Sequence, residues 1–190
     1  MKDKNLDFFF KKPEDFPSDD GNYSILHLLR RDVLTCFKVN PNNGEKIEYQ
    51  ALWPGVMTIF AGIDLLSKFY VGDYSTKNVR AKFKNFVKNF LNVNENDAEI
   101  LWQLRNALVH SFSLYSLDKK TKKEYFFSLT QIGDSFILNE ENSRYRINIG
   151  ILKEKFEEAV ELFYRKVEKS KNLKDNFNKV FSKYSGVLIA

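Results

Sequence analysis

The sequence predicts a mainly α-helical protein, a helical bundle that carries one small antiparallel β insertion at about residues 124–149. Two observations predict this class. Apolar residues recur at spacings of three and four through most of the 190 residues, which is the period of a helix with one buried face. Only between about residues 124 and 149 does the period change to two, as in short strands. With 43% apolar and 29% charged residues, the composition excludes a disordered or collagen-like chain.

The domain organisation is predicted to be simple. Residues 1–22 mix charges, phenylalanines and two prolines, which indicates an irregular N-terminal arm. Residues 23–190 contain no internal repeat and no low-complexity linker, so they are expected to form a single helical domain.

The first two predicted helices are connected by a turn. One is predicted from Tyr23, and Pro41-Asn42-Asn43-Gly44 then forms a turn. The next is predicted with Pro54 in its first turn and Gly72 as a left-handed C-terminal cap. It is apolar on nearly every side, so it should run through the middle of the bundle. Asp64 lies inside it and needs a partner if it is buried.

Later elements follow from the same periodicities. Helices are predicted over 76–91 and from about Asp97 to Tyr115, the latter with Asn96 and Glu99 as a capping pair. Three short strands are expected at 125–129, 136–138 and 145–149. A helix returns at Ile151, and a weaker terminal helix covers 173–184.

Charge, cysteine and histidine content limit the classes of function. The net charge of +5 permits a polyanionic partner such as RNA. A single cysteine, Cys36, and two histidines give no ligand set for a metal, so neither metal nor cofactor is expected. The longest uncharged stretch, Tyr49 to Ile63, has 15 residues, too few for a spanning helix, which favours a cytoplasmic protein without a membrane partner.

The helix predicted at 97–115 carries the candidate site. On an ideal helix its inward stripe consists of Leu101, Leu104, Leu108, Phe112 and Tyr115. His110 points about 160° from the centre of that stripe, with Asn106 and Gln103 beside it. Trp102 and Val109 lie on the same outward side, so Trp102, Gln103 and Val109 are expected at an association surface between two copies.

Arg105 lies on the same helix but about 140° around it from His110, which is awkward for one compact site. Two arrangements would bring the groups together. The long arginine side chain can bend round the helix, or two copies can pack across a two-fold axis so that the groups of one copy meet those of the other.

The run Arg105-Asn106-Ala107-Leu108-Val109-His110 resembles the signature of the HEPN family of helical bundles. That signature is an Arg, usually followed by Asn, Asp or His, with a second His four to six intervening residues after the Arg. The apolar helix with Phe60-Ala61-Gly62-Ile63-Asp64 is also similar to this family, and the resemblance covers about residues 52–165. It implies a HEPN-like bundle and a metal-independent endoribonuclease that works as a homodimer.

The resemblance also implies roles for the site residues. His110 would act as general acid or base, Arg105 would bind the scissile phosphate and stabilise developing charge, and Asn106 would orient one of them. Apart from the resemblance, Asp64 is expected to be a buried hydrogen-bond acceptor; the alternative is that it supports the site by pairing with Arg105 and fixing its rotamer. Such an enzyme is a hydrolase expected as a toxin or in antiphage defence, with an antitoxin or regulatory protein as partner. The alternative is a noncatalytic HEPN-like module that binds a nucleotide or a protein.

Two groups of cations are candidates for guiding an RNA backbone toward His110. Lysines follow the motif helix directly, and two arginines project from one face of a predicted strand. The alternative for the lysines is a solvated loop. The candidate residues are Lys119, Lys120, Lys122, Lys123, Arg144 and Arg146.

Overall fold

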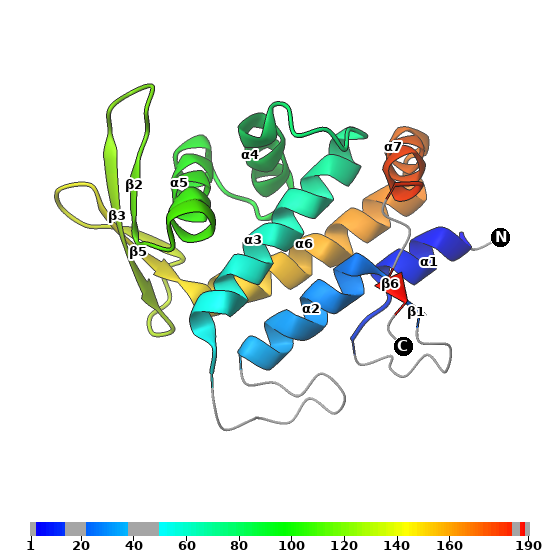
Figure 1. Cartoon of the computed structure of the whole chain (residues 1–190), viewed down its shortest axis with the longest axis horizontal. Helices are drawn as coiled ribbons and strands as arrows, with labels where there is room; N and C mark the ends of the chain where they lie inside the picture. The colour runs from blue at the N-terminus through cyan, green and yellow to red at the C-terminus, as the bar shows by residue number, and fades with distance from the viewer. Residues whose placement is uncertain (1–2, 14–21, 38–49, 184–186, 189–190) are drawn as a thin grey trace. The chain divides into compact units, whose positions relative to one another are not determined.

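A computed structural model of the chain describes residues 3–13, 22–37, 50–183 and 187–188, and it is mostly helical, as predicted (Figure 1). The chain divides into two compact units. Unit 1 takes Met1–Lys77 with Val160–Ala190, and unit 2 takes Asn78–Ala159. The sequence predicted one domain from residue 23 onward, whereas the N-terminal residues belong to the same unit as the C-terminal ones.

The described residues of unit 1 are helical apart from one short strand pair. Its elements are α1 (Lys4–Phe10), β1 (Asn22–Tyr23), α2 (Ile25–Cys36), α3 (Leu52–Val71), the end of α6 (Ile149–Lys169), α7 (Lys171–Phe181) and β6 (Val187–Leu188). The long helix α3 packs against α2 and α7, and β6 pairs antiparallel with β1. The prediction of an irregular arm over 1–22 is wrong for α1, because Asp3 caps that helix and Phe9 and Phe10 are buried.

The central helix of unit 1 has the ends that the sequence predicted. Pro54 lies in the first turn of α3, and Gly72 closes it in the left-handed region with φ 67°. Its length and composition would also suit a membrane span, but 56% of the apolar stretch is buried within the protein, as in a core helix. The turn predicted at Pro41-Asn42-Asn43-Gly44 lies outside the described residues.

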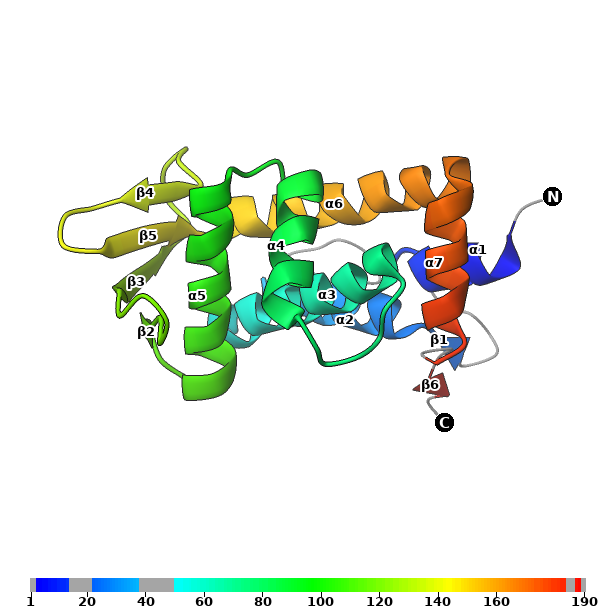
Figure 2. The ribbon, with the colours of Figure 1, turned by 90° about the horizontal axis from the view of Figure 1, so that it is seen from above.

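Unit 2 combines helices with a four-stranded sheet. Its elements are α4 (Val79–Phe90), α5 (Glu95–Ser111), β2 (Tyr115–Leu117), β3 (Glu124–Thr130), β4 (Ile137–Asn139), β5 (Arg144–Asn148) and the start of α6. The strand order is β2-β3-β5-β4, which Figure 2 shows from above. The predicted antiparallel insertion is wrong in topology. β3 and β5 are parallel neighbours, and β4 lies at the edge of the sheet, antiparallel to β5.

The sheet of unit 2 has one buried face and one exposed face. Tyr125, Phe127, Tyr145 and Ile147 alternate inward along β3 and β5, and β2 and β3 contact α5. The intervening residues point to solvent. The sheet thereby fixes one side of α5, the helix that carries the candidate site.

Candidate active site

Helix α5 begins earlier than the sequence predicted. Its N-cap is Asn94, whose side chain accepts a hydrogen bond from the backbone N–H of Asp97 at 2.9 Å. The predicted cap, Asn96, instead lies inside the first turn and is exposed. The predicted inward stripe is confirmed at Leu101, Leu104 and Leu108, which are fully buried.

The same helix also ends earlier than predicted. Phe112 caps α5 in the left-handed region, with φ 45° and ψ 43°, and its side chain is 72% exposed. Tyr115 belongs to β2 and is exposed too. The prediction that these two residues continue the inward stripe is therefore wrong. A bulky residue at positive φ is rare, and such strain gathers near functional sites.

The motif residues of α5 come together within one subunit. Nη1 of Arg105 lies 2.6 Å from Nε2 of His110 and 3.2 Å from Oδ1 of Asn106. The guanidinium also lies over the ring of Trp102, 5.2 Å from its centroid. Of the two arrangements that the sequence left open, the subunit itself realises the first: the arginine side chain bends round the helix.

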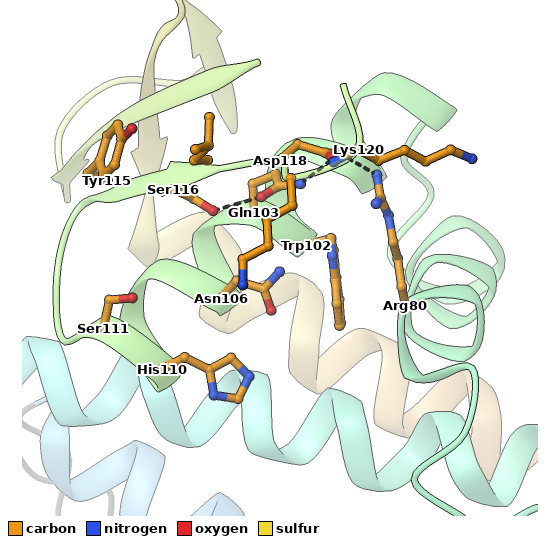
Figure 3. A pocket seen from close by; sticks show the side chains of 12 residues that line it. Arg80, Trp102, Gln103, Asn106, His110, Ser111, Tyr115, Ser116, Asp118 and Lys120 are labelled. Carbon is orange, nitrogen blue, oxygen red and sulfur yellow. Dashed lines mark hydrogen bonds and ion pairs between the residues drawn. The ribbon is translucent and has the colours of Figure 1, made fainter. Parts of the chain in front are cut away.

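His110 and Asn106 lie at one end of a cavity of about 640 Å³ (Figure 3). Its walls come from α5, from the start of α4, and from β2 with the turn that follows it. The imidazole is exposed, and the amide of Asn106 is half-buried. The lining residues are Arg80, Trp102, Gln103, Asn106, His110, Ser111, Tyr115, Ser116, Leu117, Asp118, Lys119 and Lys120. Two of the lysines that the sequence singled out therefore border the same cavity as His110.

A polar network holds the other end of the cavity. Nη2 of Arg80 contacts Oε1 of Glu99 at 2.7 Å and Oδ2 of Asp118 at 2.8 Å. Gln103 donates to both carboxylates and accepts from the Ser116 hydroxyl at 2.7 Å. The network joins α4, α5 and β2, so it fixes the wall that faces His110.

The charges of this network stabilise one another. Burial by itself would raise the pKa of Asp118, but the backbone N–H groups of Lys120 and Thr121 and the Arg80 guanidinium outweigh it and lower that pKa. Burial would also raise the pKa of Glu99, but hydrogen bonds from Lys84, Arg80 and Gln103 outweigh the effect of burial. The pKa of Glu99 is therefore lowered as well. Both carboxylates are thus held ionised, which keeps the guanidinium in place.

The network contains candidate site residues that no sequence pattern indicated, and one residue whose side chain lies elsewhere than predicted. Arg80, Glu99, Ser116 and Asp118 belong to no local motif, because 19 residues separate Arg80 from Glu99 and 38 separate it from Asp118. Gln103, predicted at an accessible association surface, is only 2% exposed and bonded within its own subunit. That prediction is wrong for its side chain.

The remaining candidates of unit 2 have mixed surroundings. Trp102 and Val109, predicted at the association surface, are half-buried. Lys122 lies in the exposed turn before β3, and the Lys123 ammonium lies 4.9 Å from the centroid of the Tyr125 ring. Arg144 and Arg146 point from the same exposed face of β5, as predicted, and Arg146 pairs with Glu140 at 2.5 Å.

Two more residues belong to unit 1: the candidate Asp64, and His27, whose flanking leucines predict a structural histidine. Asp64 is half-buried on α3, and its pairing with Arg105 stays a prediction. His27, the other histidine of the chain, is 1% exposed, and Nδ1 of its ring lies 3.3 Å from the carbonyl oxygen of Lys11. Burial lowers the pKa of His27. Its ring is enclosed in unit 1, as a structural histidine would be.

Within the described parts of the chain, no group of three or more His, Cys, Asp or Glu side chains is arranged to hold a metal ion. Comparison of the chain with protein-family models, with curated proteins and with solved structures gives no match. The chemistry of the site therefore rests on its own geometry.

Proposed function

We propose that this protein is a metal-independent endoribonuclease of the HEPN type that cleaves RNA through attack by a ribose 2′-hydroxyl. The observation that carries the proposal is the 2.6 Å contact between Nη1 of Arg105 and Nε2 of His110. Arg105 is not among the residues that line the cavity, but His110 borders it together with Lys119 and Lys120. A guanidinium and an imidazole side by side supply the charge stabilisation and the proton transfer that phosphodiester cleavage needs.

The contact between the two side chains defines the starting state. A guanidinium has donors only, so Nε2 of His110 must accept, and we assign the neutral imidazole with its proton on Nδ1. A neutral imidazole is a proton acceptor, suited to act as a general base. A phosphate would take the guanidinium fork in bidentate fashion and release Nε2 to the ribose hydroxyl.

The proposed step balances without a metal or a cofactor. His110 removes the proton of the 2′-hydroxyl, whose oxygen bonds to phosphorus, and the bond from phosphorus to the 5′-oxygen breaks. A proton is delivered to that leaving oxygen. The products are a 2′,3′-cyclic phosphate and a 5′-hydroxyl. Arg105 stabilises the negative charge that develops on the non-bridging phosphoryl oxygens, and Asn106, which accepts from Arg105, orients its guanidinium.

The two proton transfers support a homodimer. A single subunit offers one accessible imidazole, because the other histidine, His27, is buried. A second copy would supply a second His110, in its protonated form, as the acid that delivers the proton to the leaving 5′-oxygen while the neutral His110 of the first copy acts as base. RNA is then the substrate in the cytoplasm, and uncontrolled cleavage would suit a toxin or antiphage effector held in check by an antitoxin or regulatory protein.

Cleavage of a single-stranded RNA in the presence of a chelator tests the proposal. We expect 5′-hydroxyl and cyclic-phosphate ends, no cleavage of the same sequence in DNA, and loss of cleavage in His110→Ala. Lys183→Ala, an exposed cation of unit 1, is the control. No cleavage, or cleavage untouched by His110→Ala, would refute the enzyme. Retained nucleotide binding without cleavage would identify a noncatalytic module instead.

A further inference from the structure

Two aromatic rings lie side by side on the exposed face of the unit 2 sheet. Tyr115 of β2 and Phe126 of β3 are paired residues of the ladder, and their ring centroids are 5.2 Å apart. Each is 39% exposed, so both keep ring surface open to solvent. Singly scattered apolar residues are ordinary on a surface, but two rings in contact on an uncovered face form an aromatic platform.

The next strand places a cation in the same row. Phe126 is paired with Arg144 of β5, and the Arg144 side chain is exposed on this face. Arg146 follows two residues later but is paired with Glu140. The Tyr115 hydroxyl donates to Oε1 of Glu124 at 2.9 Å, while its ring is held against Phe126. Tyr115, Phe126 and Arg144 therefore form one line across three strands.

The platform and the candidate active site meet at β2, an edge strand of the sheet. Tyr115 and Leu117 of β2 also line the cavity that contains His110 and Asn106. Lys119 and Lys120, directly after β2, border the same cavity. A chain that lay along the platform would thus pass β2 and enter the cavity beside basic side chains.

We infer that this face binds single-stranded RNA, with bases stacked on Tyr115 and Phe126 and a phosphate on Arg144. The inference deepens the proposed function and rests on it for the choice of RNA. Every base has a π-face, so aromatic stacking with a neighbouring cation tolerates sequence and selects single strands, because paired bases cannot unstack onto the rings. The platform would deliver an unpaired segment to His110.

Binding is tested apart from cleavage with a fluorescein-labelled oligo(dT) of about ten nucleotides, since DNA lacks the attacking 2′-hydroxyl. We expect Tyr115→Ala and Phe126→Ala each to weaken binding between about fivefold and a hundredfold. Tyr115→Phe keeps the ring and should bind normally. Arg144→Ala should reduce the slope of log affinity against log salt by about 0.7. Tyr74→Ala, an exposed aromatic of unit 1, is the matched control.

The outcomes separate this inference from the proposed function. Ring-dependent binding without any RNA cleavage would support the platform and refute the enzyme. If cleavage depends on His110 but both alanine variants bind oligo(dT) as tightly as the wild type, the platform alone is refuted. A change in the mass of the assembly in Tyr115→Ala or Phe126→Ala would show that the face contacts a second copy, which also refutes it. Thermal unfolding of each variant identifies any loss of fold. If an alanine variant has lost its fold, binding by Tyr115→Phe is the test: weakened binding by this variant, which keeps the ring, would contradict stacking on the ring.

Discussion

The position of Arg105 on the helix does not by itself determine where its guanidinium lies. A helical wheel gives the direction in which each side chain leaves the helix, and by that measure Arg105 and His110 point about 140° apart. The guanidinium is several bonds from the backbone, and its contacts with Trp102, Asn106 and His110 bring it round the helix. The motif could therefore be recognised from its residue types and their spacing. The contact between Arg105 and His110 could not, because it depends on the conformation of the arginine side chain.

Replacing Arg105 by lysine tests whether its fork, and not only its charge, is needed. An ammonium is a compact point charge that cannot bind a phosphate in bidentate fashion while it contacts Asn106. We expect single-turnover RNA cleavage to slow by about 10²–10³-fold in Arg105→Lys, as when a donor to the developing charge is lost. Arg165→Lys, an exposed arginine of α6, should cleave at the wild-type rate. A wild-type rate in Arg105→Lys would contradict the role.

At the scale of elements, local signals placed the helices but not all of their ends. Residues up to Tyr115 have helical periodicity, yet Phe112 closes α5 and Tyr115–Leu117 pair with β3 instead. The competing force is tertiary, because a strand residue gains ladder bonds that an exposed last helical turn lacks. The parallel pairing of β3 with β5 was equally hidden, since the strand between them in sequence lies outside them in space.

The start of α5 allows a matched pair of substitutions. Asn94→Ala removes the acceptor for the Asp97 backbone N–H and should lower the free energy of unfolding by about 1 kcal/mol. Asn96→Ala, two residues later on the exposed first turn, should change it by less than about 0.5 kcal/mol. Urea unfolding followed by circular dichroism measures both. Equal effects of the two substitutions would show that Asn94 does not cap the helix.

The Asp118 carboxylate should make the attachment of β2 depend on pH. Its pKa is lowered in the folded protein, so its contribution to stability is present above the unfolded pKa of about 3.9 and is lost as pH falls through the lower folded value. Asp118→Asn loses charge-assisted bonds to Arg80 and should cost about 1–3 kcal/mol near pH 7.

Urea unfolding of wild type and Asp118→Asn at several pH values checks this expectation. The difference in unfolding free energy should stay level from about pH 7 to pH 5 and shrink as pH falls below about 4. Ser128→Ala, an exposed residue of β3, is the control for the sheet. A difference that persists unchanged at about pH 3 would mean that the carboxylate charge is not what holds Arg80.

At the scale of the whole molecule, the sequence predicted a helical core but not its division. α3 was recognised because its apolar residues cover nearly every side, and its burial in unit 1 confirms that interpretation. The two units were not predicted. Unit 1 combines Met1–Lys77 with Val160–Ala190, and no local pattern in the sequence indicates that two such distant segments pack together. The wall of the cavity was hidden because Arg80, Glu99 and Asp118 are distant from one another in the sequence of unit 2 and meet only through the fold.

The requirement for two copies can be tested by mixing. If each cleavage uses one His110 as base and the other as acid, a wild-type chain paired with a His110→Ala chain lacks one of the two. Differently tagged, separately purified chains of 22.4 kDa are mixed and allowed to exchange, and light scattering should give a mass twice that of one chain. With about a ninefold excess of His110→Ala chains, about one tenth of wild-type chains pair with each other, so activity per wild-type chain should fall about tenfold.

The same excess of serum albumin in place of the variant controls for dilution and crowding, and it should leave activity per wild-type chain unchanged. Full activity per wild-type chain in verified mixed dimers would place both proton transfers within one subunit. A strict monomer that cleaves RNA would do the same. Either result would leave the Arg105, Asn106 and His110 cluster as a site complete in itself, with the acid to be sought among the residues that line its own cavity.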